Sequence, residues 1–321
     1  MSLLVIDVGS SSLRALLFDA GAQLIPGALV RHTHRFDDDA AADPDVLRAA
    51  LETCLDEILQ HEAARSITTL GMTTFAANLL GVDAAGEALT PLYTYADTRS
   101  SADAVALAQE FDLGTAHART GCRIHPAYHP AKLRWLRRTQ PTLYGRVARW
   151  TDFATYCYSR WFGRDVPCSY SLASWTGLLN RAALRWDAEW LAALGLADSA
   201  LPPLADYDQV QRGLSDAYAA RWPALRDVPF FLALGDGAAA NIGTGGDAPQ
   251  RPVLTVGTTA ALRIVTPQPG PVPPGLWAYR VDARRHLIGG ATSEGGNLFA
   301  WARETLRLDT ADLNAALLAR E

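Results

Sequence analysis

Residues 3–18 read LLVIDVGSSSLRALLF, and residues 252–265 repeat their pattern as PVLTVGTTAALRIV. Each stretch has an apolar run, the pair Val-Gly, two hydroxyl residues, and then Leu-Arg leading into a second apolar run. Two apolar runs joined by a short glycine turn predict a β-hairpin. A pattern that returns this far along the chain predicts two lobes of related topology, each with one such hairpin. Chance similarity is the alternative.

The chain between the hairpins alternates strand and helix patterns. Apolar residues recur at helical spacing over 45–64, which predicts an amphipathic helix. The apolar run 229–234 predicts a strand that leads through Gly235-Asp236-Gly237 into a helix of small residues. Such alternation indicates an α/β fold. Strands are also expected over 67–75 and 78–82, and helices over 101–111 and 132–138.

Length and composition suit two globular domains. The chain has 321 residues, of which 49% are hydrophobic and 20% charged, and this length favours two domains over one. The segment GGDAPQRP at 245–252 has the composition of a linker. We therefore predict an N-terminal domain over 1–246 and a second domain over 247–321.

The charge balance argues against nucleic acid and membranes as partners. Lys and Arg number 29 against 34 Asp and Glu, a net charge of -5, so the chain lacks the basic field that anionic polymers attract. Lys132 is followed by Leu133, and no other lysine occurs, which rules out a G-x-x-x-x-G-K-[ST] phosphate loop. No apolar run approaches the ~20 residues of a membrane span. Four cysteines without C-x-x-C spacing favour a reducing cytoplasm.

Both hairpin turns offer a device for holding phosphate without lysine. Backbone N–H groups of a tight turn can point into one concavity and bind anionic oxygens. Gly9, Ser10 and Ser11 are such a candidate, and Thr258 with Thr259 is a second. Asp7 ends the first strand at the mouth of its turn, where a carboxylate could hold Mg²⁺ directly or through water. The alternative is that Gly9 only serves the turn and Asp7 only caps it.

Asp236 is the candidate for proton transfer. It lies between two glycines at the end of a predicted strand and the start of a predicted helix. Flanking glycines would allow a ligand to approach closely, and an aspartate there can accept a proton from a sugar hydroxyl as a general base. The alternative is that Asp236 is a helix N-cap.

Six motifs in order resemble those of the FGGY carbohydrate kinases, which belong to the actin and sugar-kinase superfold. They are DVGSSSLR at 7–14, YADTR at 95–99, SLASWTGLL at 171–179, GDGAAANIGTG at 235–245, VGTTAALR at 256–263 and GGATSEGGNLFAW at 289–301. The resemblance implies a two-lobed architecture of ribonuclease-H-like domains that binds ATP and a sugar in the cleft.

The resemblance also implies roles for individual residues. Asp236 becomes the catalytic base, and Asp7 serves Mg²⁺. The residues implied to hold the ATP are Gly9, Ser10, Ser11, Arg14, Gly257, Thr258, Thr259 and Gly296. Those implied to contact the sugar, together with Asp236, are Thr74, Phe75, Asp97 and His125. Asp97 and Arg99 are either an internal ion pair or ligands of substrate hydroxyls.

Within the family, two stretches are similar to gluconokinases. They are TGCRIHPAYHPAKLRWL at 120–136 and DG-x-x-AN at 236–241, and residues 73–76 lack the Q-M-H of xylulokinases and the R-E of glycerol kinases. Gluconate is therefore the favoured substrate, and a pentulose or polyol kinase is the alternative. A local cluster of arginines either forms a solvated helix face or attracts a sugar acid; its members are Arg134, Arg137, Arg138, Arg146 and Arg149.

Two other classes of protein compete with a kinase. A nucleotide-driven chaperone or filament protein of the same superfold would share the hairpins but would not need the glycine-flanked Asp236 or the YADTR segment. A sugar-binding fragment with weak catalysis is the second rival, because family members continue beyond position 321 into a glycine-rich segment that holds adenine. We accordingly expect an incomplete second lobe and weaker binding of ATP than of sugar. A homodimer is left open.

Overall fold

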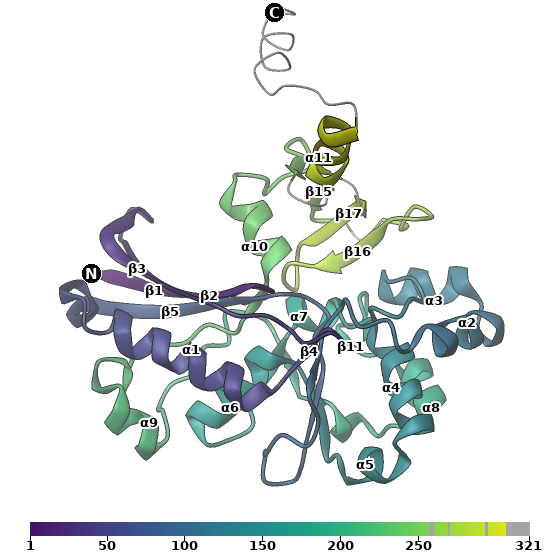
Figure 1. Cartoon of the computed structure of the whole chain (residues 1–321), viewed down its shortest axis with the longest axis horizontal. Helices are drawn as coiled ribbons and strands as arrows, with labels where there is room; N and C mark the ends of the chain where they lie inside the picture. The colour runs from purple at the N-terminus through teal and green to yellow at the C-terminus, as the bar shows by residue number, and fades with distance from the viewer. Residues whose placement is uncertain (257–259, 269, 293–294, 306–321) are drawn as a thin grey trace, which may run out of the picture.

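The computed structural model describes residues 1–256, 260–268, 270–292 and 295–305, and it is organised around two sheets (Figure 1). The first sheet has the strand order β13-β5-β1-β2-β3. Its strands are β1 (Ser2–Val8), β2 (Ser12–Asp19), β3 (Leu24–Thr33), β5 (Ile67–Thr74) and β13 (Leu234–Gly235). β1, β2 and β3 form an antiparallel meander, and β5 runs parallel to β1 and to β13. The predicted first hairpin is thereby confirmed, with Asp7 opposite Arg14.

Helix α1 (Pro44–Ile58) covers one face of this sheet (Figure 1). Asp43 caps it by accepting hydrogen bonds from the amides of Asp45 and Val46, which satisfies N–H groups that have no partner within the helix. Its apolar stripe packs into the main core. The helix is shorter than the predicted 45–64 because the chain turns into a 3₁₀ segment, η1 (Glu62–Ser66), before β5.

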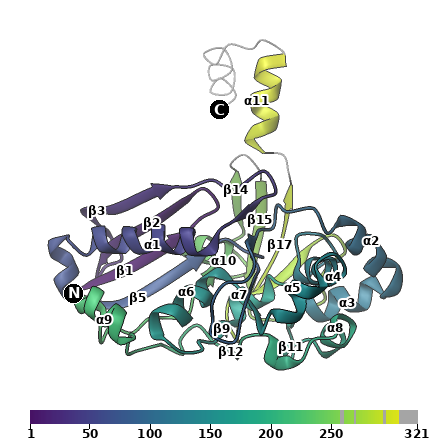
Figure 2. The ribbon, with the colours of Figure 1, turned by 60° about the horizontal axis from the view of Figure 1, so that its bottom comes forward.

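The rest of the first lobe is mostly helical and lies beside and below the sheet (Figure 2). The predicted helices at 101–111 and 132–138 are present as α2 and α4, and Pro130 stands in the first turn of α4, where its missing N–H has no cost. The predicted strand 229–234 is wrong except at its end, because residues before β13 form only isolated bridges. The helices are α2 (Ser101–Glu110), α3 (Leu113–Thr120), α4 (His129–Thr139), α5 (Pro141–Arg146), α6 (Phe153–Phe162), α7 (Tyr170–Ser174), α8 (Ala188–Leu194) and α9 (Asp216–Arg221), with 3₁₀ turns η2 (Asp198–Ala200) and η3 (Pro223–Leu225). Short paired strands are β4 (Ala41–Ala42) with β7 (Leu92–Tyr93), β6 (Leu80–Val82) with β8 (Arg149–Thr151), β9 (Cys168–Ser169) with β12 (Leu204–Ala205), and β10 (Leu179–Asn180) with β11 (Arg185–Trp186).

The second sheet is antiparallel, with the order β14-β15-β17-β16. Its strands are β14 (Val253–Val256), β15 (Ala260–Thr266), β16 (Trp277–Arg280) and β17 (His286–Thr292). β14 and β15 pair as the second predicted hairpin, but its turn residues Gly257, Thr258 and Thr259 lie outside the described residues. Helix α11 (Gly296–Thr305) stands away from the body of the molecule (Figure 2).

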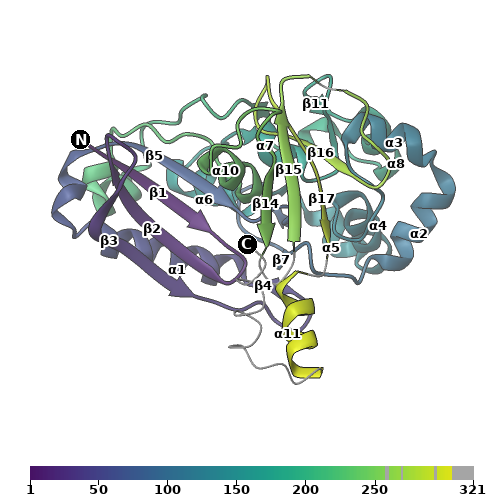
Figure 3. The same cartoon turned by 90° about the horizontal axis from the view of Figure 1, so that it is seen from above.

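Helix α10 (Asp236–Gly243) connects the two sheets. It follows β13 directly, and seen from above it lies between the first sheet and β15 (Figure 3). All four cysteines are free and buried. Among the described helices, none is both long and apolar enough to span a bilayer. The boundary at residue 246 stays a prediction.

Candidate active site

A cavity of about 450 Å³ receives side chains from both sheets and from α10. The first lobe contributes the β1–β2 turn, the segment after β5 and the loop between α3 and α4, whereas the second sheet contributes Arg263, Trp277 and Tyr279. Side chains far apart in the sequence are thus brought to one hollow. Its lining residues are Ser10, Phe75, Ala76, Ala77, Tyr95, Arg123, His125, Ala127, Tyr128, Trp175, Asp236, Arg263, Gly275, Trp277, Tyr279 and Ala291.

Asp236 is the first residue of α10 and faces this cavity. The amide of Gly237 donates to one of its carboxylate oxygens at 2.7 Å, and the other oxygen has no hydrogen-bond partner in the described chain. Burial raises the pKa of Asp236 to about 6; the Gly237 amide and Arg263 act to lower it, and Asp7 acts to raise it. Because Asp236 bonds to the adjacent amide and not to one deeper in the first turn, it is not a conventional N-cap.

The two glycines around Asp236 make room for an indole ring. A Cβ atom at Gly235 would lie 2.7 Å from Nε1 of Trp175, and one at Gly237 would lie 2.9 Å from its Cη2. Trp175 in turn stacks on Tyr279, with ring centroids 4.0 Å apart. That these glycines also allow a ligand to approach closely stays a prediction. Nε1 of Trp175 is buried without a hydrogen-bond acceptor.

The β1–β2 turn has the free donors that a phosphate needs. The Gly9 amide donates to the carbonyl of Ser12 at 2.9 Å and closes the turn. His34 holds the turn from β3, because its Nε2 lies 2.9 Å from the Gly9 carbonyl oxygen. The amides and hydroxyls of Ser10 and Ser11 make no hydrogen bond within the described chain, and Ser10 lines the cavity. This turn fits the predicted phosphate site.

Asp7 lies in a polar cluster at the end of β1. Arg14 donates to one of its carboxylate oxygens at 2.6 Å and Thr73 to the other at 3.0 Å. Asp7 acts on the pKa of Asp236, so the two carboxylates lie within electrostatic range of each other. In the parts of the chain that are described, no group of three metal-ligating side chains occurs. One or two carboxylates, with water and phosphate oxygens completing the shell, is a coordination that fits Mg²⁺.

The other predicted site residues are placed unevenly. Phe75 and His125 line the cavity, and Thr74 is buried beside it with its hydroxyl unpartnered. Asp97 does not line it: its carboxylate receives two hydrogen bonds from the Arg99 side chain, at 3.0 and 2.9 Å. The ion-pair alternative is therefore the one observed for Asp97. Gly296 begins α11, away from the cavity lining.

The predicted basic cluster is largely neutralised. Arg134 pairs with Glu110, Arg138 with Asp103 and Arg149 with Asp165. Arg137 donates to the carbonyl of Leu194. These guanidinium groups form a solvated, ion-paired surface, and none of them lines the cavity.

Sequence reasoning missed several lining residues, above all Arg123, Trp175 and Arg263. The sequence does contain a feature that points to Arg263, because it is the arginine of the repeated Leu-Arg pattern. Trp175 stands inside the SLASWTGLL motif, and Arg123 stands inside the 120–136 segment. Their spacing along the chain gives no indication that they line the same cavity as Asp236.

Comparison with known proteins identifies the family of this chain. Residues 2–243 match the model of the N-terminal domain of the FGGY family of carbohydrate kinases. The chain therefore belongs to the FGGY family of carbohydrate kinases. It is 25% identical over 306 residues to a gluconokinase of Bacillus subtilis, which covers 94% of this chain and 59% of the relative.

Other relatives carry different names. A glycerol kinase of Rhodospirillum centenum is 27% identical over 322 residues, covering 95% of this chain and 63% of that protein. The crystal structure of xylulose kinase from Rhodospirillum rubrum superposes with a TM-score of 0.91 at 20% identity, over 99% of this chain and 66% of that one. This likeness confirms the predicted α/β fold of the actin and sugar-kinase superfold. The chain spans about three fifths of the length of the curated relatives named here.

Proposed function

We propose that this chain transfers the terminal phosphoryl group of ATP to a hydroxyl of a small sugar or sugar acid, with gluconate as the favoured acceptor. The observation that carries the proposal is Asp236, whose free carboxylate oxygen faces a cavity that also contains Ser10 of the phosphate-type turn. A base and a set of phosphate-binding donors on one hollow are what phosphoryl transfer to an alcohol requires.

Different residues of the cavity have different roles in the proposed phosphoryl transfer. Asp236 has a pKa of about 6, so it is ionised at neutral pH yet basic enough to accept the hydroxyl proton. The free amides of Ser10 and Ser11 hold phosphate oxygens, and the aromatic walls of Trp175, Trp277 and Tyr279 exclude water, the competing acceptor. Asp7 would hold Mg²⁺, which when bound would supply neutralisation of phosphate charge.

Gluconate is favoured over other acceptors by two observations. The 25% identity to a gluconokinase extends over 94% of this chain, and the cavity lining has two arginines against one aspartate. The glycerol kinase relative at 27% identity supports a polyol or pentulose kinase as the second candidate. A sugar-binding chain with weak turnover stays the third candidate. Location in the cytoplasm and a homodimeric state stay predictions.

An ATP-coupled assay over gluconate, xylulose, ribulose, fuculose, glycerol and erythritol tests the proposal. Asp236→Asn serves as the inactive control, because an amide cannot accept the hydroxyl proton; it should lower kcat about 10²–10⁴-fold with sugar affinity nearly unchanged. Preference for a ketose or a polyol would move the assignment to the second candidate. Sugar binding without turnover would favour the third, and full activity of Asp236→Asn would remove Asp236 as the base.

A further inference from the structure

We propose that Arg123 and His125 form a carboxylate-binding subsite, which makes the acceptor an anionic sugar acid and not a neutral sugar. The inference rests on the proposed function and names the residues that select its substrate class. Both side chains come from the loop between α3 and α4 and line the cavity that contains Asp236.

Arg123 has a guanidinium group without a partner. It is exposed, and it makes no hydrogen bond or ion pair within the described chain. The arginines nearby on α4 differ, since Arg134 and Arg138 are each paired with a carboxylate. Asp236 is the acidic side chain among the described lining residues, and the positive charge that acts on it is that of Arg263. The guanidinium group of Arg123 is therefore available to bind an anionic ligand.

His125 presents a neutral N–H donor next to this charge. The amide of Ala127 donates to Nδ1 of His125 at 3.1 Å, so the ring proton must sit on Nε2, which has no partner in the described residues. Partial desolvation and the charges of Arg123 and Lys132 lower the pKa of His125 below its usual 6.5. The ring is therefore neutral at pH 7 with a fixed tautomer, and Nε2–H is free to donate to a ligand.

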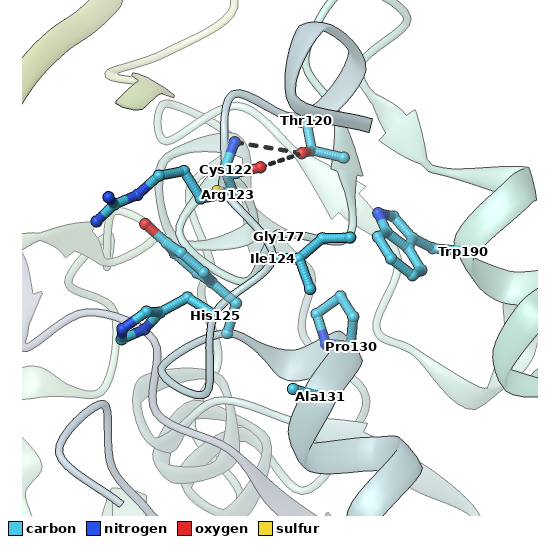
Figure 4. A pocket seen from close by; sticks show the side chains of 10 residues that line it. Thr120, Cys122, Arg123, Ile124, His125, Pro130, Ala131, Gly177 and Trp190 are labelled. Carbon is cyan, nitrogen blue, oxygen red and sulfur yellow. Dashed lines mark hydrogen bonds between the residues drawn. The ribbon is translucent and has the colours of Figure 1, made fainter. Parts of the chain in front are cut away.

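The loop holds the two donors on one side. Figure 4 shows the side chains of Arg123 and His125 extending in the same direction, whereas Ile124 points the other way, toward Pro130 and Trp190. The start of the loop is locked, because Gly121 lies in the left-handed region and a Cβ there would come within 1.9 Å of the Ala278 carbonyl oxygen. Preorganised donors lose little conformational entropy on binding.

A carboxylate matches this pair of donors. A planar guanidinium can donate to both of its oxygens, and an imidazole N–H can donate to one of them. The rest of an open-chain acid would then extend through the cavity toward Asp236, which accepts the proton of a hydroxyl. A neutral polyol offers no anionic group to Arg123, so it gains only ordinary hydroxyl contacts there.

The test is calorimetric titration of the 321-residue chain, which does not depend on turnover. The ligands are D-gluconate and D-glucitol, which share an open chain of hydroxyls and differ in the carboxylate, with Mg-ATP as a third ligand. The variants are Arg123→Gln, Arg123→Lys and, as the matched control, Arg146→Gln. Arg146 is also exposed and unpaired among the described residues, but it lies on α5 outside the cavity.

We expect wild type to prefer gluconate over glucitol, and Arg123→Gln to weaken gluconate binding about 10–100-fold, the range for hydrogen bonds to charged groups. Arg123→Lys should retain part of the affinity, while glucitol and Mg-ATP binding, and all binding by Arg146→Gln, stay near wild type. Equal wild-type affinity for gluconate and glucitol overturns the subsite, and so does an equal loss of gluconate binding and Mg-ATP binding in Arg123→Gln. A wild type that binds glucitol as tightly as gluconate and phosphorylates neutral sugars would overturn the subsite and leave the kinase proposal standing. Failure of Asp236→Asn to lose turnover concerns the kinase proposal alone.

Discussion

Replacing Asp236 by asparagine should stabilise the fold while it lowers kcat. The carboxyl group ionises near pH 3.8 in an ordinary environment, and burial raises its pKa to about 6 in the folded chain. The folded protein therefore holds this proton more tightly than the unfolded chain does. Its stability falls as pH rises from about 4 to 6, and the full loss is present at neutral pH. An asparagine cannot ionise, so the variant does not suffer that loss.

The expected gain can be estimated from the pKa. A rise from 3.8 to about 6 corresponds to about 3 kcal/mol at 1.36 kcal/mol per pH unit. Residual solvent contact of the carboxylate reduces this figure, so we expect the variant to gain about 1–3 kcal/mol at pH 7.5. The amide oxygen of asparagine can still accept the hydrogen bond from Gly237, and the new NH₂ group takes the place of the carboxylate oxygen that has no hydrogen-bond partner in the described chain.

Urea denaturation followed by tryptophan fluorescence at pH 4.5 and pH 7.5 measures the effect. The gain should be large at pH 7.5 and mostly absent at pH 4.5. Asp97→Asn is the matched control. Burial acts to raise the pKa of Asp97, but the hydrogen bonds from Arg99 outweigh it and hold that pKa below the usual value. Its replacement should lower stability at pH 7.5. An Asp236→Asn variant that is no more stable than wild type at pH 7.5, or equally stabilised at both pH values, refutes the reasoning.

Three other predictions concern the surroundings of this site and the core. Arg263→Met removes a charge that lowers the pKa of Asp236, so the acid limb of the kcat profile should move to higher pH; a limb that stays in place contradicts the assignment. Gly235→Ala would place a Cβ 2.7 Å from the Trp175 ring and should cost about 1–3 kcal/mol of stability, measured by thermal denaturation, whereas an unchanged Tm would show that the indole moves freely. Glu52 is buried and paired with two arginines, so Glu52→Gln should lower the free energy of unfolding by about 3–5 kcal/mol at pH 7. Burial acts to raise the pKa of Glu52, but its hydrogen bonds outweigh this and hold the pKa below its usual value. The stability difference between wild type and Glu52→Gln should therefore shrink on acidification. A difference that does not change with pH argues against an ionised pair.

Local patterns were enough to predict the two hairpins and the junction of β13 with α10. The hairpin of β1 and β2 follows from alternating apolar residues around one glycine, and Asp236 follows from its place between a strand end and a helix start. The repeat of the first hairpin near residue 257 correctly indicated that β14 and β15 pair. These features depend on residues within about ten positions of one another, which is the range that periodicity and turn chemistry report.

The composition of the cavity could not be predicted in the same way, because it depends on packing between distant segments. Five arginines close together in the sequence suggested an anion-attracting surface, yet carboxylates from elsewhere in the first lobe pair with three of them. Arg123, which stands outside that cluster, is unpaired and reaches the cavity. Whether an arginine is free depends on which acids the fold brings near it, and that is a tertiary property.

Trp175 links two motifs that seem independent in the sequence. The indole ring covers Gly235 and Gly237 on either side of Asp236, and it is itself held by stacking on Tyr279 of the second sheet. Burial is the largest cause of the raised pKa of Asp236, and Trp175 supplies part of that burial. The glycines are therefore needed to admit the ring that desolvates the base. The SLASWTGLL and GDGAAANIGTG segments act together, because the protonation of the aspartate in one depends on the packing of the tryptophan in the other.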